Sequence, residues 1–105
     1  MHTDHGIYRF RFDPDVPMAD VHESLKLAIF AAEGLHGTAR VRLDFAYCAD
    51  DGKRALVLDA RGEAGRCVAR ILTGFLTQQF GETAFRVERV TQQPETDLAG
   101  IAQES

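Results

Sequence analysis

The 105-residue sequence contains no tryptophan and no asparagine, and it has only two lysines and two cysteines. Cys48 and Cys67 lie far apart, without a C-x-x-C pair or any spacing typical of a metal site. We therefore expect two free thiols, which are typical of a reducing compartment, rather than a disulfide framework. The longest apolar run, residues 27–32, is far too short to span a bilayer. Because the first six residues also lack the apolar stretch of a signal peptide, we expect a cytoplasmic protein without a membrane segment.

The charge balance lacks the positive excess that nucleic-acid-binding domains usually carry. The formal net charge is −4, and the chain has ten arginines. A net negative charge argues against binding nucleic acid over a broad surface, because phosphate binding depends on clustered lysine and arginine.

Catalytic motifs are missing as well. Ser24 and Ser105 are the only serines, and neither lies in a G-x-S-x-G elbow. A nucleophile at Cys48 would need a nearby base such as His36, and a small inert side chain is the simpler interpretation. Neither an H-E-x-x-H helix nor a Cys/His set with zinc spacing occurs, so we expect no cofactor and no metal. An enzyme that acts through pockets between subunits stays open as the least favoured hypothesis.

The hydrophobic pattern changes period several times within one domain, residues 7–90. Alternation typical of half-buried strands covers 7–12, 39–49 and 84–90. Residues 54–61 are also predicted to be a strand, and its centre, residues 56–58, is apolar on both faces as expected of an interior strand. A period of about 3.6 residues, typical of amphipathic helices, covers 18–34 and 63–80. The order β-α-β-β-α-β predicts an α+β fold, a ferredoxin-like two-layer sandwich with a four-stranded antiparallel sheet and two helices on one face. Residues 1–6 are expected to be a flexible leader.

The segment 39–49 is the most regular of the predicted strands. Its alternation predicts that Val41, Leu43, Phe45 and Tyr47 face the core, and that residues 50–53 form a hairpin turn with Gly52 at a positive φ. The rest of the predicted core consists of Tyr8, Phe10, Phe12, Phe85, Val87 and the helix stripes, which include Leu35, Leu25 and Leu72.

The other face of the predicted sheet is rich in arginine. Strand parity assigns to it Arg9, Arg11, Arg40, Arg42 and Arg86, together with Asp44 and Glu88. This face could be a solvated surface of cross-strand ion pairs, or an interface for a second copy or a protein partner. Single-stranded RNA binding is a third alternative, but the aromatic residues that would stack on bases share parity with the core.

A second candidate surface lies on the outer side of the first helix. Phe30 is opposite the core stripe, and Leu27, three positions away, is its neighbour on the helix surface. This apolar pair could be a subunit contact, or a dock for the polar tail at 91–105. In that tail Leu98, Ile101 and Ala102 match one face of a short helix.

The turn before the second long helix could bind a small anion. Arg61, Gly62, Gly65 and Arg66 surround the predicted helix N-terminus, where backbone amides attract negative charge. Glu63 in the first helical turn opposes this, and the spacing matches neither phosphate-binding glycine motif.

Taken together, these patterns favour a small domain that acts by association, as a homo-oligomer or with a protein partner. Small-ligand binding in a regulatory domain is the alternative, and RNA binding on the sheet is a further one. The fold itself does not decide between them, because it hosts many functions.

Overall fold

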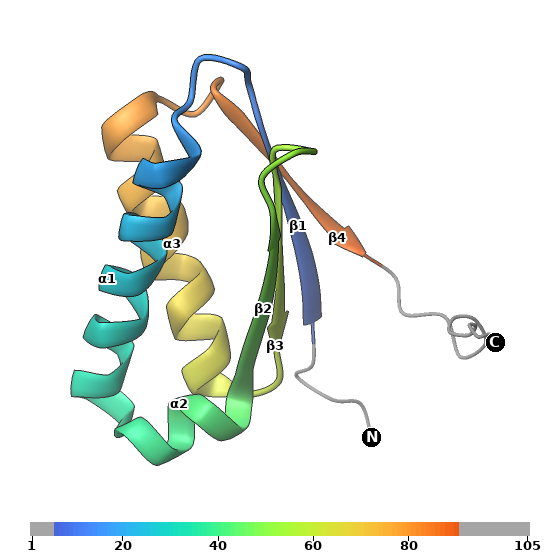
Figure 1. Cartoon of the computed structure of the whole chain (residues 1–105). Helices are drawn as coiled ribbons and strands as arrows, with labels where there is room; N and C mark the ends of the chain where they lie inside the picture. Colours follow the sequence, from blue (N-terminus) through green and yellow to red (C-terminus); the bar gives the residue numbers. More distant parts are fainter. Residues whose placement is uncertain (1–5, 91–105) are drawn as a thin grey trace, which may run out of the picture.

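Four antiparallel strands and three helices make up residues 6–90, the part of the chain that the computed structural model describes (Figure 1). In chain order the elements are β1 (Gly6–Phe12), α1 (Met18–His36), α2 (Thr38–Asp44), β2 (Phe45–Asp50), β3 (Ala55–Ala60), α3 (Glu63–Phe80) and β4 (Phe85–Val90). The helices lie on one side of the sheet. The predicted α+β class and antiparallel sheet are confirmed, whereas the predicted count of two helices is wrong. The predicted docking helix at 91–105 lies outside the described residues.

The sheet has the strand order β2-β3-β1-β4. β1 is central and pairs antiparallel with β3 on one side and β4 on the other. Phe10 in the middle of β1 lies opposite Leu56 on β3 and Val87 on β4. Because side chains alternate along a strand, this register directs Tyr8, Phe10 and Phe12 to the helix side and the intervening arginines to the open side.

The core lies between the sheet and the two long helices. Three phenylalanines form its upper part, with ring centroids of Phe10 and Phe85 6.2 Å apart and those of Phe12 and Phe85 6.1 Å apart. The helices contribute the stripes that their periodicity predicts. Fully buried side chains there are Val21, Leu25, Ala28 and Ala32 from α1, and Ala64, Val68, Leu72 and Leu76 from α3.

The predicted strand at 39–49 is wrong over its first half. Residues 38–44 form α2, and only Phe45–Asp50 is a strand. The chain leaves α1 at Gly37, whose φ of 92° breaks the helix, and then winds again. Asp44 lies one helical turn after Arg40, and their side chains are 3.9 Å apart, an ion pair that favours helix. The sequence predicted a strand here because Val41 and Leu43 are apolar at alternate positions. Two apolar residues at this spacing also occur in a short helix, where they lie on different faces.

Four residues predicted to be in the core are largely exposed. Tyr47 is 53% exposed, because it lies on β2, an edge strand of the sheet. Leu43 is 69% exposed because α2 buries only Val41. Leu35 is 72% exposed in the last turn of α1, where the chain turns away at Gly37. Val87 lies on the helix side of the sheet as predicted, but it is exposed because β4 is an edge strand.

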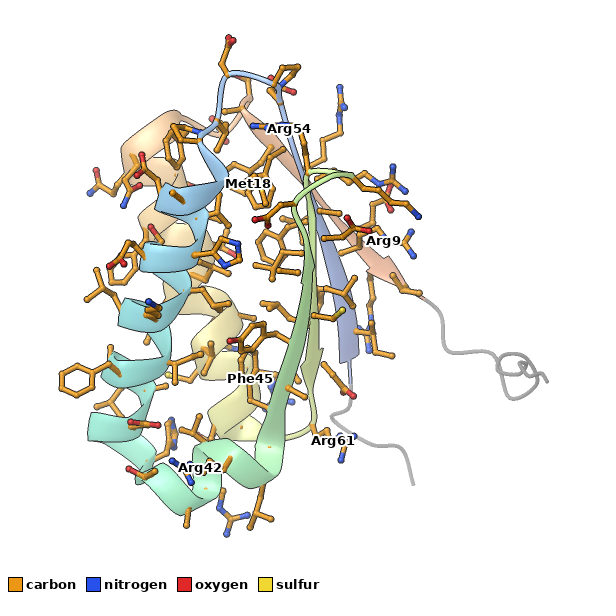
Figure 2. The ribbon with its side chains drawn as sticks, viewed as in Figure 1. Arg9, Met18, Arg42, Phe45, Arg54 and Arg61 are labelled. Carbon is orange, nitrogen blue, oxygen red and sulfur yellow. The ribbon has the colours of Figure 1, made fainter. Side chains whose placement is uncertain are left out.

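The hairpin between β2 and β3 has its positive φ at Arg54 rather than at Gly52, which corrects the predicted turn. Arg54 holds this unfavourable conformation while its guanidinium binds the loop before α1 (Figure 2). Nε and Nη2 donate to the carbonyl oxygen of Asp13 at 3.1 and 2.8 Å, and Nη2 also donates to that of Val16. Three hydrogen bonds from a charged donor can offset the cost of a left-handed backbone.

Candidate functional site

The open face of the sheet carries three of the five arginines predicted for it. Arg9 and Arg11 project from β1, and Arg86 projects from β4. The prediction for Arg40 and Arg42 is wrong, because both belong to α2 in the helical layer. Figure 2 shows this separation, with Arg9 beside the sheet on the side away from the helices and Arg42 at the opposite corner of the molecule.

Half of the open face is apolar. Its twelve positions are Ile7, Arg9, Arg11, Ala46, Cys48, Asp50, Ala55, Val57, Asp59, Arg86, Glu88 and Val90. Arg9 and Arg11 both pair with Glu88, at 3.5 and 3.7 Å, and exposed pairs of this kind contribute little stability. None of these twelve described positions is aromatic, so the face lacks the stacking platform that single-stranded RNA recognition uses.

The outer surface of α1 carries the apolar pair found in the sequence. Phe30 is 75% exposed and Leu27 is 54% exposed. Ala31 and Gly34 are exposed on the same side, since residues three, four and seven apart share a helix face. We call Leu27, Phe30, Ala31 and Gly34 the α1 outer patch.

Gly34 is unusual within this patch. A glycine inside a helix costs about 1 kcal/mol relative to alanine. A Cβ at Gly34 would meet nothing within 4 Å, so packing within the chain does not require glycine there. Gly34 therefore presents bare backbone on the same helix face as the exposed Phe30 ring.

The turn before α3 is closely packed. The Arg61 N–H donates to the carbonyl oxygen of Asp44 at 2.7 Å, which joins the α2–β2 junction to the start of α3. A Cβ at Gly62 would lie 2.5 Å from the Asp44 carboxylate, and one at Gly65 would overlap the Asp44 carbonyl oxygen. These two glycines therefore allow Asp44 to approach α3, and the structure gives them a packing role.

A polar cavity of about 410 Å³ lies beside this turn, lined by His36, Arg40, Asp44, Arg61, Gly62, Glu63 and Ala64. Its two arginines are balanced by two carboxylates, Asp44 and Glu63. The Arg40 and Asp44 side chains already pair across it. An anion entering here would meet the carboxylates as well as the arginines, so the cavity has no clear preference for an anion.

Arg66, the fourth residue predicted for this turn, lies elsewhere. It lines a groove of about 360 Å³ between α3 and β4, together with Tyr8, Ala69, Arg70, Thr73 and Val87. Sequence reasoning missed this groove because it placed Tyr8 and Val87 in the core. The available signal was the spacing of Arg66, Arg70 and Thr73, which share the polar face of α3.

The described residues contain neither a metal-binding cluster nor a contact between Cys48 and His36. Between residues 6 and 90, no three side chains of His, Cys, Asp or Glu come together as a metal ion requires. Cys48 lies on the open face of the sheet, whereas His36 ends α1 in the helical layer, so the structure does not bring this pair together. Both cysteines are free thiols. None of the helices described has the length and apolar character needed to cross a membrane.

Comparisons of this chain with protein-family models, with curated proteins and with solved structures found no match.

Proposed function

We propose that this protein works by association, and that it pairs with a second copy of itself through the α1 outer patch. The observation that carries the proposal is the exposed Phe30 beside Ala31 and Gly34, on a helix whose opposite stripe is buried. A surface helix normally has one apolar face, which packs on the core. Because α1 already buries such a face, its second apolar face is available to another protein.

The patch is complementary to itself. If two α1 helices pack antiparallel, Phe30 of each copy lies against Ala31 and Gly34 of the other. Such reciprocity is the condition for a two-fold symmetric interface. Lys26 and Glu23, whose charged groups are 3.8 Å apart, lie beside Phe30 and would form a polar rim.

The length of the patch limits the strength of the dimer. A helix of 19 residues is about 28 Å long. Stable interfaces bury about 800 Å² per partner, and one helix face of this length supplies less. We therefore expect a dimer that dissociates on dilution.

The open sheet face is the weaker of the two candidate surfaces. Its arginines have partners within the chain, since Arg9 and Arg11 pair with Glu88. Its apolar residues are small or half-buried, whereas the α1 outer patch presents a large ring. Aromatic side chains are the residues that usually dominate binding energy at interfaces.

We further infer that the fold is ferredoxin-like. Read from β4, the sheet order is 4-1-3-2, and α1 and α3 occupy the two crossover positions. These features support a split βαβ arrangement, in which α2 is an additional short helix before β2. The two free thiols fit a cytoplasmic protein.

The test is light scattering behind size-exclusion chromatography, from low micromolar to near millimolar concentration. We expect the unmodified chain to change from monomer to dimer, and Phe30→Glu to remain monomeric. Leu43→Glu is the matched control, because Leu43 is also exposed and apolar but lies on α2. The control should dimerise as the unmodified chain does.

A second variant tests whether Gly34 is needed for dimerisation or for the stability of the monomer. Gly34→Leu adds a bulky side chain to the face against which the partner's Phe30 would pack, and because leucine favours helix more than glycine it should not lower thermal stability. We expect this variant to be monomeric with an unchanged or higher melting temperature. A chain that is monomeric throughout, or a dimer that neither Phe30→Glu nor Gly34→Leu weakens, would overturn the proposal.

A further inference from the structure

The groove between α3 and β4 has the size and shape of a small-molecule site. Its volume of about 360 Å³ falls within the range of ligand pockets, about 300–1,000 Å³. It is open along the β4 edge of the sheet, and none of its residues belongs to the α1 outer patch. Its function therefore does not depend on the proposed dimer.

The floor of the groove is apolar and partly aromatic. Tyr8 and Val87 come from the helix side of the sheet, and Ala69 comes from α3. The Tyr8 hydroxyl end lies over Gly6, where a Cβ would be only 2.9 Å from the oxygen. Glycine at this position allows the Tyr8 ring to lie along β1, where the ring lines the groove.

The walls of the groove are cationic. Arg66 and Arg70 are four residues apart on α3, so their side chains share one face. Arg89 extends the positive charge from β4, with its guanidinium carbon 6.0 Å from the centre of the Tyr8 ring. The described lining residues include no Asp or Glu.

The Thr73 side chain limits which hydrogen bonds the groove can offer to a ligand. Its hydroxyl donates to the carbonyl oxygen of Ala69 at 2.8 Å, so its oxygen can only accept a hydrogen bond from an occupant. The guanidinium groups are therefore the donors that would hold an anion. Arginine presents a planar pair of N–H groups that matches a carboxylate.

We infer that this groove binds a small organic anion, a carboxylate carried on a flat apolar body. The carboxylate pairs with Arg70 and Arg66, and the body lies on Tyr8, Ala69 and Val87. Both parts contribute, because the arginines alone would also attract inorganic anions and the floor alone would take any small apolar molecule.

The test uses the full-length protein, labelled with ¹⁵N, and follows amide chemical shifts during titration with four probes. Benzoate has both parts of the expected ligand, benzamide lacks the charge, acetate lacks the body, and inorganic phosphate is an anion without a body. We expect saturable shifts with benzoate at residues 66–73 and in β4, and binding at least about tenfold weaker for each of the others. Equal binding of benzamide, acetate or phosphate, or benzoate shifts located elsewhere, would contradict the inference.

Benzoate binding by substituted proteins then tests whether the anion binds in the groove. Arg70→Gln removes the exposed guanidinium and should weaken benzoate binding by about tenfold or more, whereas Arg70→Lys should recover part of it. Ala69→Leu should block binding by filling the floor. Arg40→Gln, an exposed arginine on α2, is the control and should bind as the unmodified protein does. Equal losses in Arg70→Gln and Arg40→Gln would indicate a general charge effect and overturn the site.

Discussion

Gly65 illustrates how a single missing side chain determines a contact between elements. It is buried in the first turn of α3, beneath the carbonyl oxygen of Asp44. Gly74, also in α3, is exposed and has nothing within 4 Å of where its Cβ would lie. The same residue type therefore has opposite consequences at two positions of one helix.

We predict that Gly65→Ala lowers the free energy of unfolding by about 1–3 kcal/mol, because the new Cβ overlaps backbone that has no flexible end to move. Gly74→Ala should raise it by about 0.5–1 kcal/mol, because alanine favours helix and meets no neighbour. Chemical denaturation of both variants measures this difference. Similar effects at the two positions would show that Asp44 does not approach α3 as described.

At the scale of elements, α2 is where sequence and structure differ most. α1, α3, β1, β3 and β4 were predicted close to their observed positions because each carries a clear stripe or alternation of buried residues. α2 has only seven residues and buries one, Val41, so it carries no helical stripe. Its helical form depends instead on the turn at Gly37 and on the hydrogen bond from Arg61 to Asp44, which are tertiary features.

Two substitutions in α2 distinguish a helix from the strand that alternation predicts. Val41→Ala should lower stability by about 1–3 kcal/mol, because it leaves a cavity in the core. Leu43→Lys should change stability by no more than about 0.5 kcal/mol, because the side chain is exposed. Thermal and denaturant melts measure both. If residues 39–49 were a strand with both side chains inward, Leu43→Lys would be the more damaging of the two.

The α1 outer patch could be predicted from the sequence, whereas the α3–β4 groove could not, because the groove depends on tertiary structure. Exposure of Leu27 and Phe30 follows from the phase of one helix, which local sequence contains. The α3–β4 groove unites Tyr8, Arg70 and Val87, which are far apart in the chain. Strand parity alone cannot tell that Val87, on the inner side of the edge strand β4, is left exposed.

At the scale of the whole molecule, residues 6–90 are electrically balanced, with twelve acidic and twelve basic side chains. Four acidic residues outside 6–90, namely Asp4, Glu95, Asp97 and Glu104, account for the net charge of −4. Two copies that meet through residues 6–90 therefore bring together bodies without net charge, and the proposed contact is apolar.

We predict that dimerisation is nearly independent of salt. The dissociation constant should change by less than about threefold between about 0.01 M and 1 M salt, although the Debye length falls from about 30 Å to 3 Å over this range. Sedimentation equilibrium at both concentrations measures it. Strong weakening at high salt would instead implicate the arginines of the open sheet face.

The central position of β1 has a consequence for how the protein is made. Of the four described strands β1 is the first to leave the ribosome, and one of its two neighbours, β4, is the last. Until β4 has been synthesised, β1 has a free edge, and such edges are prone to pair with other chains. The nascent protein thus carries its most aromatic strand incompletely paired until the last of the four described strands has been made.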